Sequence, residues 1–260
     1  MTAATATTMR AATARRGYIY VWMASACALL AFGGFAGTYW LQIGAGTFKG
    51  TPILHLHGLV FSAWTIFLLS QTVLAARGRL QHHRAWGLAG ISIATAMVFL
   101  GLTVALQGLN TKLAEGYGDQ ARAFMWLPLG SLSLFAGFFI AAIANINRWE
   151  WHKRFMLVAT CSALAAAAAR IGFLISTGGG PGVRPGLGPP PPPALGGADA
   201  VIVSLILAAG AIYDWRTRGK PHPAYLIGIG AILAFGFIGP FFAQTPAWFA
   251  AMDALATLAR

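Results

Sequence analysis

Apolar residues are gathered in long runs along the chain, and polar residues are concentrated in the short stretches between them. We place seven membrane-crossing runs, of which the sixth is the shortest: Tyr18–Leu41, Ile53–Ala76, Ala85–Leu106, Ala123–Ile146, Phe155–Ser176, Ala198–Tyr213 and Pro223–Phe242. A helix needs about 20 apolar residues to cross the hydrocarbon core. Backbone polar groups must be paired in hydrocarbon, and the alternation typical of barrel strands is absent. The pattern therefore predicts an all-α integral membrane bundle of seven transmembrane helices.

The composition agrees with this pattern. Of the 260 residues, 57% are hydrophobic and only 9% are charged, whereas soluble proteins carry about 25% charged residues. This hydrophobicity excludes a soluble domain and a disordered chain. The two cysteines exclude a disulfide scaffold.

The few charged residues are mostly basic, and they predict an orientation. If the seven runs alternate in direction, twelve of the 18 basic residues share the side of the N-terminus: Arg10, Arg15, Arg16, Arg77, Arg79, Arg84, Arg148, Lys153, Arg154, Arg216, Arg218 and Lys220. Basic residues in short loops stay in the cytoplasm, so we expect a cytoplasmic N-terminus and a C-terminus outside. Contact with anionic membrane lipids explains the net charge of +12. We expect no nucleic-acid partner, because no extramembrane domain is large enough.

The polar stretches divide the chain into regions. Residues 1–17 are expected to form a cytoplasmic tail before a retained first span, and residues 18–243 the transmembrane domain. Within it, the Pro/Gly-rich segment 177–199 is an outer loop, and a spacer role suits it better than proline recognition. Residues 244–260 are expected to form an interfacial helix, because Thr245 and Pro246 are typical of a helix start.

Histidines near the cytoplasmic side are the first candidate site. His82 and His83 precede the third span, and His152 precedes the fifth. Small residues follow at helical spacing on the same faces (Gly87, Gly90 and Ala94 after His83; Ala159, Ala163, Ala166 and Ala167 between His152 and Arg170). Such faces allow either a neighbouring helix or a flat tetrapyrrole to approach closely.

We therefore consider a cofactor, haem b or a copper or iron ion, held by His82 or His83 together with His152. Arg84 and Arg154 would then pair with haem propionates. The alternative is that His82, His83 and Arg84, like His152 and Arg154, are simply basic residues at the headgroup boundary.

A second polar set lies within the spans. His57, Trp64 and Gln71 recur at seven-residue spacing and share one stripe of the second span. Arg170 lies at a depth similar to that of His57. Ordinary interhelical hydrogen bonds would account for this stripe, and Arg170 could snorkel. The alternative is a polar cluster that binds an anionic or other small ligand.

The two cysteines, Cys27 and Cys161, both fall within spans at a similar depth. They are expected to serve as small apolar residues, with a redox pair as the alternative.

Two segments resemble known families. His57-Gly58, Trp64, Gln71 and His83-Arg84 with Gly87 resemble a pattern in uncharacterised bacterial multipass membrane proteins. The run Trp151-His152-Lys153-Arg154-Phe155-Met156 resembles the His-Lys-Arg-x-Met opening found there and in four-helix proteins of cytochrome oxidase assembly. The resemblance covers Leu54–Leu88 and Glu150–Ala159, and this chain differs from the four-helix proteins in its number of spans.

The resemblance implies a bacterial inner-membrane protein linked to haem or copper handling, with respiratory-chain proteins as partners. We therefore expect a multipass protein of respiratory electron transfer or oxidase assembly. The alternative is a transporter or ligand-binding membrane protein that uses the His/Gln/Arg cluster. No hydrolytic triad, phosphate-binding loop or zinc-protease motif is present in the sequence, so no catalytic residue is assigned.

Overall fold

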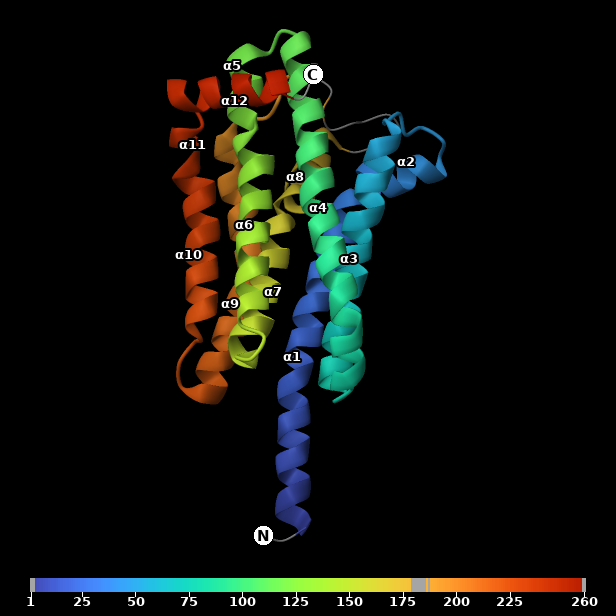
Figure 1. The fold of residues 1–260 in the computed structure, drawn as a ribbon, viewed down its shortest axis with the longest axis vertical. Coiled ribbons are helices and arrows are strands. Elements are labelled where there is room, and N and C mark those ends of the chain that lie inside the picture. Colours follow the sequence, from blue (N-terminus) through green and yellow to red (C-terminus); the bar gives the residue numbers. More distant parts are fainter. Residues whose placement is uncertain (1–2, 179–185, 187, 259–260) are drawn as a thin grey trace.

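The computed structural model describes residues 3–178, 186 and 188–258, and for residues 3–17 the backbone alone. This part of the chain is helical and contains no strand. Its elements are α1 (Ala3–Phe35), the π-helical turn η1 (Ala36–Trp40), α2 (Leu41–Gly44), α3 (Pro52–Ala76), α4 (Leu80–Ala114), α5 (Gly118–Phe124), α6 (Trp126–Ala144), α7 (Trp149–Ala163), α8 (Ala165–Thr177), the 3-10 turn η2 (Pro193–Leu195), α9 (Gly196–Arg218), α10 (Pro223–Phe237), α11 (Gly239–Phe242) and α12 (Pro246–Leu258). Figure 1 shows the long helices packed side by side, with α12 across one end.

Six helical segments of the described chain are long and apolar enough to cross a membrane: Tyr18–Gly44, Pro52–Ala76, Leu80–Ala114, Gly118–Ala144, Trp149–Thr177 and Pro193–Arg218. They correspond to the first six predicted runs. The seventh run divides into α10, a shorter apolar helix of 15 residues, and the four-residue α11. The length and apolar composition of these helices thus indicate a multipass membrane protein.

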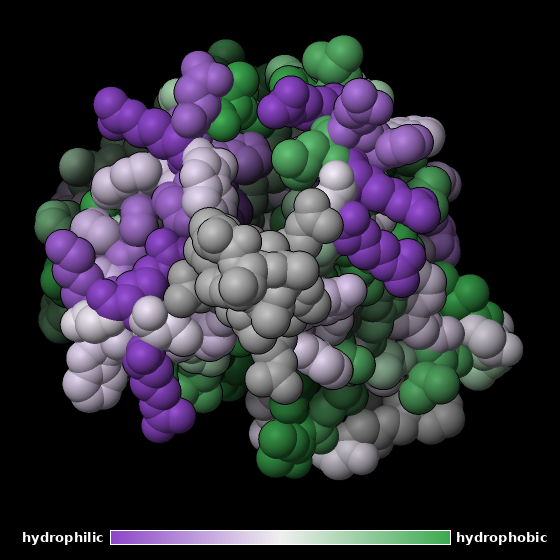
Figure 2. All heavy atoms as spheres, turned by 90° about the horizontal axis from the view of Figure 1, so that it is seen from below, coloured by the Kyte–Doolittle hydropathy of each residue, from purple (hydrophilic) through white to green (hydrophobic). Residues whose placement is uncertain are grey.

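The two ends of the bundle differ in charge. The α3–α4, α6–α7 and α9–α10 connections meet at the lower end in Figure 1, which we call the basic end because Arg77, Arg79, Arg148 and Lys220 lie there. Figure 2 looks onto this end and shows hydrophilic side chains gathered around it. The sequence-predicted distribution of these basic residues is therefore present in the fold.

Helix α7 is the centre of the packing. It contacts α6, α9, α10 and α1, and Leu157, Val158, Ala159 and Cys161 on it are at most 1% exposed. Large apolar side chains instead cover the outside of the bundle, among them Leu29, Ile66, Leu88, Phe99, Ile140, Ile175 and Leu205. An apolar outside is what a bilayer requires of a membrane bundle.

The end opposite the basic end is closed by α12. Met252 and Ala256 pack on Leu109, Ala121 and Met125 in one buried cluster. The Trp248 indole N–H donates to the Arg122 carbonyl (2.8 Å). The backbone N–H of Trp248 donates to the Thr245 hydroxyl (3.3 Å), so Thr245 caps this helix as its sequence predicts.

Helices α1 and α8 approach each other most closely at Gly34. A Cβ atom at this position would overlap the backbone carbonyl of Ala167, and one at Gly37 would lie 2.9 Å from the side chain of Leu174. The small residues noted in the fifth span are thus used, at Ala167, to admit a neighbouring helix.

We predict that Gly34→Ala will destabilise the protein by about 1–3 kcal/mol, because backbone atoms of α8 would have to move. The matched control is Gly33→Ala, whose Cβ would have no atom within 4 Å. Thermal unfolding in detergent compares the two variants. Equal melting temperatures for both would contradict the close approach of α1 and α8.

Candidate functional site

Two of the predicted histidines meet near the basic end. The rings of His83, from the first turn of α4, and His152, from the first turn of α7, have centroids 6.4 Å apart and are nearly perpendicular. The Nδ1–H of His152 donates to the Ala142 carbonyl at 2.9 Å, so its Nε2 carries the free lone pair. The Nδ1 of His83 is buried without a hydrogen-bond partner among the described residues.

His152 has one feature of a metal-ligating histidine. A ligating histidine usually donates its other ring N–H to a carbonyl or carboxylate, which fixes the ring, and Ala142 does this for His152. Metal–nitrogen bonds are about 2 Å long, so an ion shared by the two rings would need a ring nitrogen of each residue directed towards the other ring.

The other residues of this predicted site lie differently. His82 and Arg84 are exposed. The helix face formed by the small residues after His83 is partly covered, because the Phe67 ring lies where a Cβ atom of Gly90 would be. Two cavities lie along α4, of about 720 and 560 Å³, and neither is lined by His83 or His152. The structure therefore brings together two imidazoles, with the small-residue face filled by helix packing.

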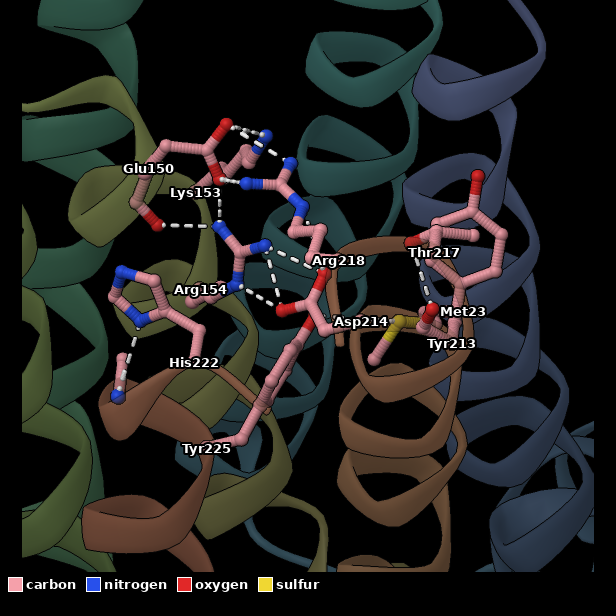
Figure 3. A network of polar contacts seen from close by, with 11 residues as sticks. Met23, Glu150, Lys153, Arg154, Tyr213, Asp214, Thr217, Arg218, His222 and Tyr225 are labelled. Atoms are coloured by element: carbon pink, nitrogen blue, oxygen red, sulfur yellow. Dashed lines mark hydrogen bonds and ion pairs between the residues drawn. The ribbon is translucent and has the colours of Figure 1, made fainter. Parts of the chain in front are cut away.

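Arg154 is held by protein oxygens (Figure 3). Its Nε donates to Asp214 Oδ2 at 2.9 Å, and its Nη2 donates to Asp214 Oδ1 and Oδ2 at 2.8 and 2.7 Å. Its Nη1 bonds to the carbonyl and the carboxylate of Glu150. The side chains of Arg154 and Asp214 are only 0% and 2% exposed. All three guanidinium nitrogens of Arg154 are thus hydrogen-bonded within the protein. No free nitrogen remains to pair with a haem propionate.

This buried pair is the centre of a larger network. Arg218 bridges both acids, with Nη1 3.0 Å from Glu150 Oε2 and Nε 3.4 Å from Asp214 Oδ1. Lys153 lies 3.1 Å from Glu150 Oε1. The rings of Tyr20 and Tyr225 lie 5.7 and 5.4 Å from the guanidinium carbon of Arg154. The network thereby joins α7 and α9 and is flanked by α1 and α10.

Asp214 and Glu150 are not among the site residues predicted from the sequence, although acids are scarce in this chain. The scarcity was itself the signal. Only six acidic residues are present in the chain, and Asp214 lies beside an apolar run in a region of basic residues. An acid so placed would be expected to pair with a buried cation.

The residues of the second predicted polar set lie in separate regions of the structure. Trp64 donates its indole N–H to the Thr160 hydroxyl at 3.2 Å, an interhelical hydrogen bond between α3 and α7. Gln71 is buried near the basic end of α3. His57 stacks on Phe61, with ring centroids 4.1 Å apart. Its neighbour Gly58 lies close to Tyr39 of η1, and Arg170 lies against Phe35 at the adjoining end of α1. His57 and Arg170 therefore share one region, far along α3 from Gln71.

The two cysteines also meet. Their Sγ atoms are 3.9 Å apart, and both residues are fully buried. Leu157, Val158 and Leu164 surround them in the same apolar cluster. Cys27 of α1 and Cys161 of α7 thus help to fill the contact between their helices.

We predict that Asp214→Asn will lower the free energy of unfolding by about 3–5 kcal/mol, because it leaves the buried Arg154 charge uncompensated. Asp253→Asn is the control, since Asp253 pairs with Arg122 at the surface and such pairs contribute about 0–1 kcal/mol. Chemical unfolding in detergent measures both. A loss of stability in Asp214→Asn no larger than that of the control would contradict the importance of the buried pair.

We also predict a pH dependence at His222, which lies between α9 and α10. Desolvation and the positive charge of Arg154 lower the pKa of His222 below its ordinary value of 6.5. Its neutral Nδ1 accepts the N–H of Ala224 at 3.1 Å and caps α10. The stabilisation is therefore present above about pH 6.5 and is lost as the pH falls through the lowered pKa.

The test of this dependence is His222→Asn, which keeps a capping acceptor but does not titrate. Melting temperatures between pH 7.5 and 5 should fall less steeply in this variant than in the wild type. The same slope in both proteins would rule out His222 as a contributor.

Among the described residues, no group of three or more His, Cys, Asp or Glu side chains is placed to hold a metal ion. Any metal at His83 and His152 would therefore have two protein ligands of these kinds. In comparisons with known proteins, no family model, curated protein or solved structure matches this chain.

Proposed function

We propose that this protein is a metal-binding multipass membrane protein whose ion, copper or iron, is held by His83 and His152. The observation that carries the proposal is the meeting of these two rings, 6.4 Å apart, with His152 oriented by the Ala142 carbonyl. Imidazole suits both copper and iron. The two residues come from helices that are far apart in sequence, and each lies in the first turn of its helix.

The ion is favoured over haem b by the surroundings of the two rings. A haem needs a flat slot beside its axial ligands, whereas Phe67 fills the small-residue face at Gly90 and Arg154 is bonded to Asp214 and Glu150. A bound copper or iron ion would supply one-electron redox chemistry. The protein residues would hold the ion and limit its access to water.

We further propose the setting of this site. The basic end would face the cytoplasm of a bacterial inner membrane, because basic residues in short loops are retained there. Helices α10 and α11 together would then form the seventh span and place the C-terminus outside. The likeness of Trp151–Met156 to proteins of oxidase assembly supports a role in respiratory electron transfer or in the delivery of a metal to an oxidase.

The test is metal binding by the purified protein. We expect about one copper or iron ion per wild-type chain, by elemental analysis and by titration with each metal. His83→Ala and His152→Ala should each weaken binding more than the 10- to 100-fold typical of changes around a metal ligand. His82→Ala is the matched control, because His82 is adjacent to His83 but exposed.

An absorption spectrum separates the two cofactors. A Soret band that both His83→Ala and His152→Ala abolish would replace the ion with haem at the same residues. A wild-type protein that binds neither copper, iron nor haem would overturn the proposal. An equal loss of binding in His82→Ala would do the same.

A further inference from the structure

Arg170 presents a charge that the described part of the protein leaves without an acidic partner. Its Nη1 donates to the Ala166 carbonyl at 3.0 Å, and its guanidinium carbon lies 4.4 Å from the Phe35 ring centroid. No carboxylate of the described residues pairs with it; Asp199, which lies towards the same end of the bundle, forms no ion pair there. An arginine in a membrane helix usually has a partner, because isolated charges are costly in hydrocarbon.

The direction of Arg170 argues against snorkelling. Arg170 lies seven residues before the end of α8 at Thr177, about 10 Å along the helix. Its bond to Ala166 points the side chain back along α8, away from that end and towards the middle of the bundle. A snorkelling arginine would extend towards the nearer interface.

Two further polar atoms lie on the helices that meet at this level. His57, five residues after the start of α3, has a buried Nδ1 without a partner in the described chain, and Thr38 of η1 has a buried hydroxyl in the same state. Helix α1 packs on both α3 and α8, and η1 directly continues α1. Gly58, which follows His57, lies close to Tyr39 of η1. Buried polar groups normally have partners, so these two atoms are available to hydrogen-bond with a bound ligand.

The backbone around Arg170 is built for a close approach. Gly34 and Gly37 of the α1–η1 segment pack on Ala167 and Leu174, one turn on either side of Arg170. Residues 36–40 form a π-helical turn, an irregularity that is frequent at functional sites. The break between α7 and α8 at Leu164 lies two turns before Arg170. These features hold the guanidinium against Phe35 and fix its position.

We infer that Arg170, His57 and Thr38 form a binding site for an oxyanion, a carboxylate or a phosphate group. The guanidinium fork matches such a group geometrically, and a hydroxyl and an imidazole N–H can donate further hydrogen bonds. The group could be the head of an anionic lipid or a free anion. This site does not depend on the metal proposed at His83 and His152.

The experiment uses the full chain in nanodiscs of phosphatidylcholine, with phosphatidylglycerol or inorganic phosphate as the added probe. Binding is measured by native mass spectrometry for the lipid and by the shift in melting temperature for phosphate. Retention of phosphatidylglycerol would identify a lipid-borne group, and a response to phosphate alone would identify a free anion. Arg170→Gln should weaken the binding by about 10- to 100-fold, as expected for hydrogen bonds to a charged group.

Two variants guard against a purely structural effect. Thr38→Val keeps the shape of the side chain and should weaken the binding to a smaller degree, whereas Arg84→Gln, an exposed arginine at the basic end, should leave it unchanged. A wild-type protein that binds neither probe would overturn the inference, whatever the variants do. An equal loss in Arg84→Gln would overturn it too, because general charge would then explain the binding.

Discussion

The ion pair between Arg154 and Asp214 is the constraint on which the basic end depends. Both side chains are almost wholly buried, and the guanidinium meets the carboxylate through Nε and Nη2. Neither charge could be accommodated there alone, because desolvation of an unpaired ion is very costly. Each residue therefore requires the other, and the register between α7 and α9 follows from their meeting.

The position of this pair affects the proposed metal site. His152 precedes Arg154 by two residues on α7, so the anchoring of Arg154 also fixes the first turn from which His152 reaches Ala142. Helix α7 is in addition the most central helix of the bundle. The imidazole that we propose as a ligand is thus supported by the most firmly held segment of the fold.

Polar groups occupy two levels of an otherwise apolar bundle. At the basic end, Lys153, Arg154 and Arg218 pair with Glu150 and Asp214. Among the described residues there, Nδ1 of His83 and Oε1 of Gln71 are buried without a hydrogen-bond partner. Towards the opposite end, Arg170 has no acidic partner among the described residues, and the buried Nδ1 of His57 and hydroxyl of Thr38 have no hydrogen-bond partner there. We propose a cation between the imidazoles at the first level and an oxyanion at the second, so the two proposed sites would bind ions of opposite charge.

The sequence by itself determined the helical membrane fold, the approximate positions of the six spanning helices and the end at which the basic residues gather, because hydrophobic runs and loop charges are local properties of the chain. It also indicated that His83 and His152 lie at the same end of the bundle. Only the tertiary structure decided that His83 and not His82 faces His152, that Arg154 belongs to Asp214, and that Gln71 is remote from His57 and Arg170. These pairings depend on helix rotation and on contacts between residues such as Arg154 and Asp214, 60 positions apart, which spacing within one helix does not specify.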